Sequence, residues 1–152
     1  MYALNLPNYD VKIRKTYNGI EIFDALRKKF LILTPEEWVR QNFTNYLIVE
    51  KRYPASLMAN EATIKLNSLT RRCDTIVYNN MLEPVAICEY KNPEIVINQD
   101  TFDQIVRYNI VLKVKYLIVS NGITHYCCKI DYTKMDYEFL KDIPFYDELI
   151  SP

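Results

Sequence analysis

Glycine is scarce in this chain of 152 residues, which holds it only at positions 19 and 122. Loops that cradle nucleotide phosphates need several glycines at fixed spacing, as in G-x-x-x-x-G-K-[ST] or G-x-G-x-x-G. Two glycines so far apart cannot make either pattern. The composition therefore excludes phosphate-loop motors and nicotinamide enzymes, and we expect no nucleotide cofactor.

Several other signals are also missing. The single histidine, His125, has no serine or cysteine beside it in a recognisable triad, which gives Ser–His or Cys–His hydrolysis little support. The four cysteines include no C-x-x-C pair, so we expect buried, reduced thiols and no zinc site. No apolar run is long enough to span a membrane, and the first residues do not resemble a signal peptide. We therefore expect a cytoplasmic protein with no membrane partner.

Net charge is absent as well, because 19 basic residues balance 19 acidic ones. A protein that grips DNA by electrostatics alone is usually basic, so neutrality argues modestly against that class. It does not argue against an enzyme whose carboxylates hold a metal ion. The length fits one domain over residues 1–152, and we expect its core to lie at about residues 34–131.

The first third of the chain predicts a β-hairpin and then a helix. Apolar residues alternate with polar ones on both sides of Asn18-Gly19, the strongest short hairpin signal. A short apolar run follows at residues 30–33. A helix is then predicted, with Thr34 as its N-cap, Pro35 at the first helical position and Glu37 completing a capping box. This helix should end near residues 50–52.

The rest of the chain predicts a sheet with further helices. We expect strands near residues 57–66, 72–78, 84–90, 116–120 and 123–130. The first three are joined by short turns and should be antiparallel. A second helix should run from Asp100 or Thr101 to about Lys113, and a short one should lie near residues 137–141. The predicted fold class is α/β, a mixed central sheet flanked by helices and preceded by a hairpin.

Two of the predicted strands carry charges that a buried strand should not tolerate without a reason. Asp74 lies in one, and Glu89 and Lys91 lie two residues apart in the next. Strand alternation puts Glu89 and Lys91 on one face, and the spacing makes Asp74 a fitting hairpin partner. Two converging carboxylates suit Mg²⁺ or Mn²⁺, and the backbone carbonyl of Tyr90 could add a ligand.

Such an ion would polarise a phosphate and lower the pKa of a bound water. Lys91 would orient that water or stabilise the charge that develops on the phosphate. Glu61 is a further acid in the otherwise uncharged stretch 55–64, and it could be a third acidic ligand. These residue types therefore favour metal-assisted hydrolysis of a phosphodiester.

The second predicted helix adds an independent indication. Its apolar side collects Phe102, Ile105, Val106 and Ile110, and its opposite side collects Gln104, Arg107 and Tyr108. The polar side could face a phosphate or a base. An ordinary exposed helix face explains it equally well, and Asp74 could instead form a plain salt bridge with Arg71 or Arg72. What favours a site is the order and spacing of all these residues together.

That order resembles the PD-(D/E)XK nuclease superfamily, through Glu61, Asp74, Glu89-Tyr90-Lys91 and the Gln104-to-Tyr108 stretch. Cys73 stands where the motif has proline. One branch is closer still: the chain resembles short bacterial proteins related to the N-terminal nuclease domain of the type I restriction enzyme R (HsdR) subunit. This resemblance covers about residues 5–146. It is carried by Ile22-Phe23-Asp24, Arg27-Lys28-Lys29, Leu33 to Gln41, and Gln104 to Asn109.

The resemblance implies a restriction-endonuclease-like fold and a set of roles. Asp74, Glu89 and Glu61 would hold Mg²⁺ or Mn²⁺, and Lys91 would assist catalysis. DNA contact would fall to the helix and to nearby basic residues, namely Gln104, Tyr108, Arg107 and Arg72.

The expected function is metal-dependent cleavage of DNA phosphodiester bonds by an endodeoxyribonuclease-like hydrolase. The alternative is a catalytically weak nuclease-fold module that binds DNA or protein, and a purely structural subunit is a third class. A complete R subunit also carries an ATP-driven translocase, which this glycine-poor chain cannot supply. A motor or specificity function would therefore come from a protein partner.

Overall fold

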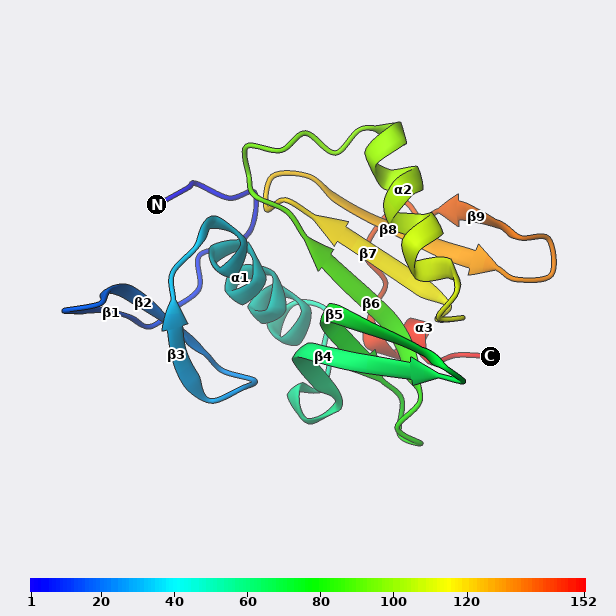
Figure 1. Ribbon diagram of the computed structural model, residues 1–152, viewed down its shortest axis with the longest axis horizontal. Helices are drawn as coiled ribbons and strands as arrows, with labels where there is room; N and C mark the ends of the chain where they lie inside the picture. Colours follow the sequence, from blue (N-terminus) through cyan, green and yellow to red (C-terminus); the bar gives the residue numbers. More distant parts are fainter.

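The computed structural model describes residues 1–152 and contains two β-sheets and three α-helices (Figure 1). The small sheet has the order β1-β2-β3, formed by Ile13–Thr16, Gly19–Asp24 and Lys29–Ile32. The large sheet has the order β4-β5-β6-β7-β8-β9, formed by Met58–Leu66, Leu69–Tyr78, Pro84–Tyr90, Tyr116–Ser120, His125–Asp131 and Asp136–Phe139. The helices are α1 (Pro35–Val49), α2 (Gln99–Ile110) and α3 (Tyr146–Leu149), with a 3₁₀ turn at Ala55–Leu57.

The large sheet is mixed, as expected. Strands β6 and β7 are parallel, and all other neighbours are antiparallel. The parallel pair needs a crossover, and α2 supplies it. The predicted fold class, a mixed sheet with helices and an N-terminal hairpin, is therefore confirmed.

The hairpin forms where Asn18-Gly19 predicted it, with Gly19 at φ +120°, and β3 extends it into a third strand. The following helix starts as predicted, because the Thr34 hydroxyl accepts a bond from the Glu37 amide at 3.1 Å. The second hydrogen bond of a capping box, from the Thr34 amide to the Glu37 carboxylate, does not form. The Glu37 carboxylate instead faces Arg27 and Arg40, which draws it away from the helix end.

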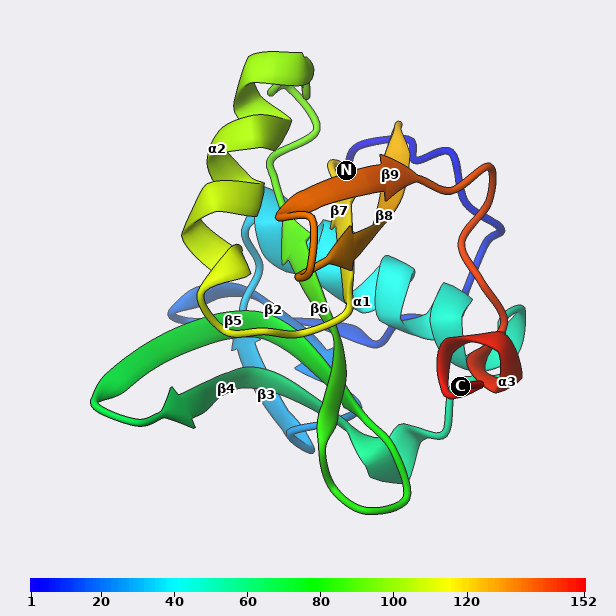
Figure 2. The same cartoon turned by 90° about the vertical axis from the view of Figure 1, so that its right-hand side faces the viewer.

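The two faces of the large sheet carry separate cores. Helix α1 and helix α3 cover one face, where the buried residues include Val39, Phe43, Leu47, Tyr90, Ile118 and Leu149. Helix α2 covers the other face, where they include Ile76, Ile87, Phe102, Val106 and Leu117. Figure 2 shows α1 and α2 on opposite sides of the sheet. Because Tyr146 and Leu149 are buried, the core extends past residue 131.

The predicted helix at residues 137–141 is wrong, because β9 occupies this stretch and pairs with β8. Its Phe139 packs on Phe102 and Tyr126, so contacts across the fold decide the structure there. Helix α2 is capped by Asn98 and ends at Ile110, which is earlier than predicted at both ends.

Two predictions from composition can be compared with the fold. All four cysteines are buried and free, as expected. No helix is both long and apolar enough to cross a membrane.

Candidate active site

Asp74 and Glu89 face each other across the β5–β6 ladder. The register pairs Thr75 with Cys88, and the next step along it brings Asp74 opposite Glu89. The backbone amide of Tyr90 donates to Asp74 Oδ2 at 2.8 Å, which fixes that carboxylate at the end of β6. The structure thus brings together the two acids that the sequence placed on neighbouring strands.

The Glu89 carboxyl lies in a setting that opposes its ionisation. Burial and then the nearby Asp74 charge raise the pKa of Glu89 to about 7, and the Lys91 ammonium and the Asn109 side chain offset only part of this effect. When Glu89 is ionised, the two acids therefore repel each other more than their surroundings compensate. A cation bound between them would relieve that repulsion.

A pocket of about 230 Å³ opens beside these acids. Strand β6 contributes Glu89 and Lys91, and α2 contributes Gln104, Ile105, Tyr108 and Asn109. Gln104 and Tyr108 were predicted to face the site, and the structure places both on the pocket wall. Arg107 lies on the exposed side of α2 and does not line the pocket.

Asn109 belongs to this site, although the sequence reasoning missed it. Its Nδ2 donates to the Ile105 carbonyl at 2.9 Å, and its buried Oδ1 has no hydrogen-bond partner. An amide on the otherwise apolar face of the helix was the available signal. A buried acceptor without a partner, next to Glu89, is suited to a proton donor or a bound water.

Glu61 sits on β4 opposite Asp74, but both of its oxygens are already held. Oε1 lies 2.6 Å from Arg40 Nη2, and Oε2 lies 2.7 Å from Arg72 Nε. Burial acts to raise the pKa of Glu61, yet the two guanidinium groups outweigh it and lower the pKa. Its backbone is left-handed, at φ +51°, a conformation that costs a non-glycine residue energy and often marks a functional site.

Arg40 is the second residue that the sequence reasoning missed. Its side chain is 6% exposed, and from α1 it reaches across to both β4 and β5. Nη1 donates to the Asp74 carbonyl at 3.0 Å, and Nη2 lies 3.9 Å from Asp74 Oδ1. Its spacing of three residues from Glu37, whose Oε1 lies 3.4 Å from Arg40 Nε, was the only hint in the sequence.

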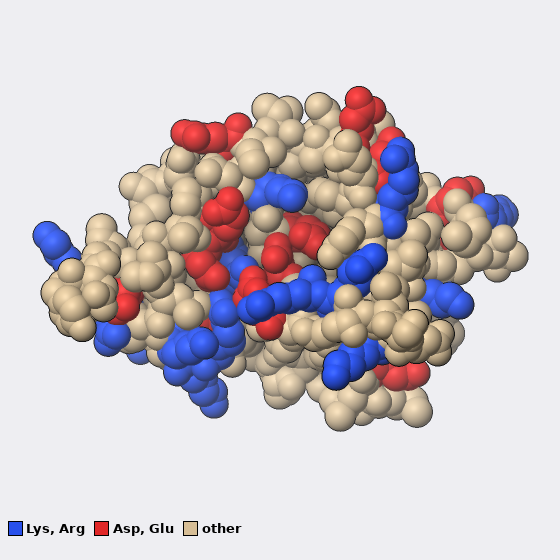
Figure 3. Space-filling view, in the orientation of Figure 1, with Lys and Arg blue, Asp and Glu red and all other residues tan.

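Basic groups border the acids on the solvent side. The Arg72 side chain is 71% exposed while it binds Glu61. The Arg71 guanidinium lies 4.6 Å from the centre of the Tyr108 ring, and so joins β5 to α2 beside the pocket. Figure 3 shows acidic side chains gathered in the middle of one face with basic side chains running beside them.

The donor set at Asp74 and Glu89 fits a hard divalent ion. Two carboxylates and a backbone carbonyl, that of Tyr90, are oxygen ligands, and Mg²⁺ commonly takes one or two carboxylates and keeps several waters. No three side chains of His, Cys, Asp or Glu gather closely enough to hold an ion between them. Glu61 would become a third ligand only by releasing an arginine.

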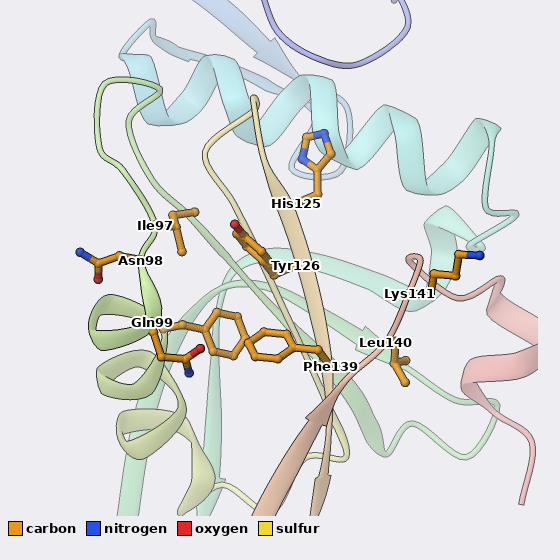
Figure 4. A pocket seen from close by; sticks show the side chains of 9 residues that line it. Ile97, Asn98, Gln99, His125, Tyr126, Phe139, Leu140 and Lys141 are labelled. Carbon is orange, nitrogen blue, oxygen red and sulfur yellow. The ribbon is translucent and has the colours of Figure 1, made fainter.

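A larger pocket of about 390 Å³ lies at the other end of α2 and is walled by Phe102, Tyr126 and Phe139 (Figure 4). Most of its polar groups already have partners. His125 Nδ1 is 2.7 Å from Ser120 Oγ, and its Nε2 is 2.9 Å from the Asn5 carbonyl. Ser120 is fully buried, so this pair cannot act as a nucleophile and base on a substrate.

We expect Glu89→Gln to become more stable relative to the wild type as the pH rises from about 5 to about 8 in metal-free buffer. A raised carboxyl pKa means that the folded state holds its proton longer than the unfolded state. The wild type therefore loses stability as the pH climbs through the folded pKa, and glutamine removes that loss. Melting temperatures of both proteins, measured across this pH range with EDTA present, check the prediction. The exposed Glu138→Gln variant is the control, and an equal trend in it would contradict the assignment to Glu89.

Comparisons with known proteins show the family and the fold. The sequence pattern of the family described as "Type I restriction enzyme R protein N terminus (HSDR_N)" matches residues 35–144. A solved structure described as a fragment of an HsdR subunit of a type I restriction enzyme, from Vibrio vulnificus, aligns with a TM-score of 0.52 and 21% identity. The alignment covers 77% of this chain and 24% of that one. No curated protein matches.

The matched region contains both acids, Lys91 and the pocket wall of α2. It leaves the small N-terminal sheet outside. The resemblance predicted from the sequence is confirmed over residues 35–144, and the chain belongs to the family of type I restriction enzyme R protein N termini.

Proposed function

We propose that this protein is a metal-dependent nuclease that cleaves DNA phosphodiester bonds. The observation that carries the proposal is that Glu89 and Lys91 line one pocket while Asp74 lies beside Glu89, with the Glu89 pKa raised to about 7. Crowded carboxylates beside a lysine are costly to a fold unless they serve a ligand. The family match and the restriction-enzyme-like fold support the same reading.

Asp74, Glu89 and the Tyr90 carbonyl would hold Mg²⁺ or Mn²⁺. When bound, the ion would supply a polarised phosphate oxygen and a more acidic water. The Tyr90 amide, at 2.8 Å from Asp74 Oδ2, keeps one ligand oriented. Glu61 would act mainly through its arginines, or as a third ligand after one of them is released.

Lys91 shares the pocket with Glu89 and would stabilise the charge that develops on the phosphate or orient the attacking water. Gln104 and Tyr108, on the opposite wall, would contact the DNA strand. Arg72 keeps most of its side chain exposed and would bind a flanking phosphate, and Arg107 would add charge from the outer face of α2. A cytoplasmic location would give the enzyme both DNA and Mg²⁺.

The test is cleavage of labelled DNA by the purified protein in Mg²⁺ or Mn²⁺, with Asp74→Asn alongside. The panel contains duplex, single-stranded and branched forms. We expect cleavage by the wild type and a loss of about 10²-fold or more in the variant, since one ligand of the ion is weakened. Isothermal titration of Mg²⁺ should show weaker binding to the variant. Equal cleavage by both proteins would refute the proposed site.

A second candidate is a nuclease-fold module that binds DNA or a partner subunit without useful turnover. The ion pairs that occupy both Glu61 oxygens favour it, because they leave two acids for the ion. The chain also spans only 24% of the matched HsdR-fragment chain. Divalent-ion binding without cleavage of any DNA form would support this candidate.

A further inference from the structure

The zero net charge of the chain hides a strong separation of charge. Residues 12–29, which form most of the small N-terminal sheet, hold six of the nineteen basic residues and two of the nineteen acidic ones. The excess is four positive charges, so the remainder of the chain carries an equal negative excess. The small sheet therefore has the charge of a nucleic-acid contact, while the body does not.

Most of this positive charge is not used inside the protein. The ion pairs of the region involve Arg14 with Glu21, and Arg27 with Asp24 and Glu37. The other four basic residues take part in none: Lys12, Lys15, Lys28 and Lys29. Lys15, Lys28 and Lys29 are exposed, and Lys12 is exposed above the Phe23 ring. Four lysines without internal partners can each bind an external anion.

The shape of the small sheet fits a nucleic-acid groove. The β1–β2 hairpin projects from one end of the molecule, at the left of Figure 1. Tyr17 at its tip is 97% exposed and is followed by Asn18 in the turn. The hairpin tip is two-stranded, because β3 pairs only with Glu21–Asp24 of β2. A two-stranded β-ribbon is narrow enough for the major groove of B-form DNA, which is about 12 Å wide.

The small sheet is firmly fixed relative to the acidic site. Its Asp24 is fully buried and accepts from Asn60 Nδ2 at 3.2 Å. Asn60 Oδ1 accepts from Thr75 at 2.6 Å, and Thr75 Oγ1 accepts from the Tyr90 hydroxyl at 2.9 Å. This buried chain of hydrogen bonds ends at the residue whose amide holds Asp74. These hydrogen bonds therefore hold the small sheet in a fixed position relative to Asp74 and Glu89.

The basic arm and the acidic site also share one face. Figure 3 shows basic side chains at the left, over the small sheet, followed by further basic side chains that lead to the central acidic group. A polyanion that reaches the site could lie along this track. A flexible peptide would not need such a rigid, ribbon-shaped arm, and a lipid surface would not reach the recessed acids beyond it.

We propose that the β1–β2–β3 sheet is a duplex-DNA-binding arm, with its lysines on the phosphates and the Tyr17 tip in a groove. The proposal rests on the proposed nuclease function and makes duplex DNA its substrate form. Residues 12–29 lie outside residues 35–144, the region that the family pattern matches.

The test compares two fourfold lysine-to-glutamine variants that change the net charge equally. The arm variant replaces Lys12, Lys15, Lys28 and Lys29. The control replaces Lys113, Lys115, Lys129 and Lys134, which line a pocket at the opposite end of the molecule. Each set contains one lysine in the left-handed conformation and one above an aromatic ring, so the two variants carry similar structural risks. Melting curves verify that both fold.

Binding is measured by fluorescence anisotropy with a labelled duplex and its separate single strand, over NaCl concentrations of about 50–200 mM. EDTA is present, so the result does not depend on cleavage or on a bound metal. We expect the arm variant to bind the duplex about tenfold or more weakly and with a salt dependence shallower by about two to four. The control should change the affinity by less than about threefold. Tyr17→Ala should weaken duplex binding with an unchanged salt dependence.

Three results would overturn the proposal. Equal weakening by both variants would mean that only total charge matters. An unchanged duplex affinity of the arm variant would mean that the lysines do not touch DNA. Weakened binding of anionic vesicles by the arm variant, with duplex binding intact, would assign the arm to membranes. If the wild type binds duplex through the arm yet cuts no DNA, the arm stands and the nuclease proposal fails.

Discussion

Replacing Lys91 with alanine is expected to lower the rate of DNA cleavage by about 10²–10³-fold, the usual loss when one charge-stabilising donor is removed from an active site. Lys91 and Glu89 line the same pocket, and the Lys91 charge acts on the Glu89 carboxyl. Single-turnover cleavage of an end-labelled duplex at saturating Mg²⁺ isolates this chemical step from binding and product release. Lys134→Ala, an exposed lysine far along the chain, is the matched control.

The same variant separates two roles for Lys91. Because its ammonium lowers the pKa of Glu89, its loss should also shift metal binding to higher pH. If Lys91 only keeps Glu89 ionised, high pH together with high Mg²⁺ will restore the full rate. A rate that stays low under those conditions assigns Lys91 to the transition state. Full recovery would contradict that assignment.

Arg40→Ala is expected to destabilise the fold by about 3–5 kcal/mol, the range for breaking a buried ion pair from one side. Arg40 joins α1 to β4 and β5, and its removal leaves Glu61, Glu37 and the Asp74 carbonyl without this partner. Urea unfolding at neutral pH measures the free energy of unfolding directly. The loss of unfolding free energy is large because Glu61 and Glu37 are mostly buried and lose a partner that water cannot fully replace.

Arg72→Ala provides a control on the same carboxylate. It also removes a partner of Glu61, but its side chain is largely exposed, so the expected loss is below about 1 kcal/mol. Acid gives a further check. The two arginines lower the pKa of Glu61. The stability that Arg40 supplies is therefore present at neutral pH and is lost as the pH falls through the pKa of Glu61 in the folded protein. Equal losses for the two variants, or a gap that does not narrow in acid, would refute this view of Arg40.

Short sequence patterns correctly predicted the elements whose structure depends on residues close together in the chain. Asn18-Gly19 determined the hairpin, Thr34 and Pro35 determined the start of α1, and strand alternation placed Glu89 and Lys91 together. Asp74 opposite Glu89 followed from the short β5–β6 connection. Each of these depends on spacing along the chain, which a sequence displays.

The missed features depend on contacts between distant segments. Arg40 reaches strands that lie 21 and 34 residues further along the chain, and no local pattern indicates such a bond. Strand β9 has no distinctive local signal, and its pairing with β8 decides its form. The charge separation was hidden because a net charge is a sum over the whole chain, whereas binding depends on where the charges lie.

The hydrogen-bond chain from Asp24 to Tyr90 has a consequence for how the molecule unfolds. The family pattern begins at residue 35, yet Asn60, Thr75 and Tyr90 depend on Asp24, which precedes it. A fragment that starts at residue 35 would still contain Asp74 and Glu89. It would lack Asp24, so the buried Asn60 amide would lose its hydrogen-bond acceptor. The small sheet and the site should therefore melt as one cooperative unit, and the border of sequence similarity is not a border of folding.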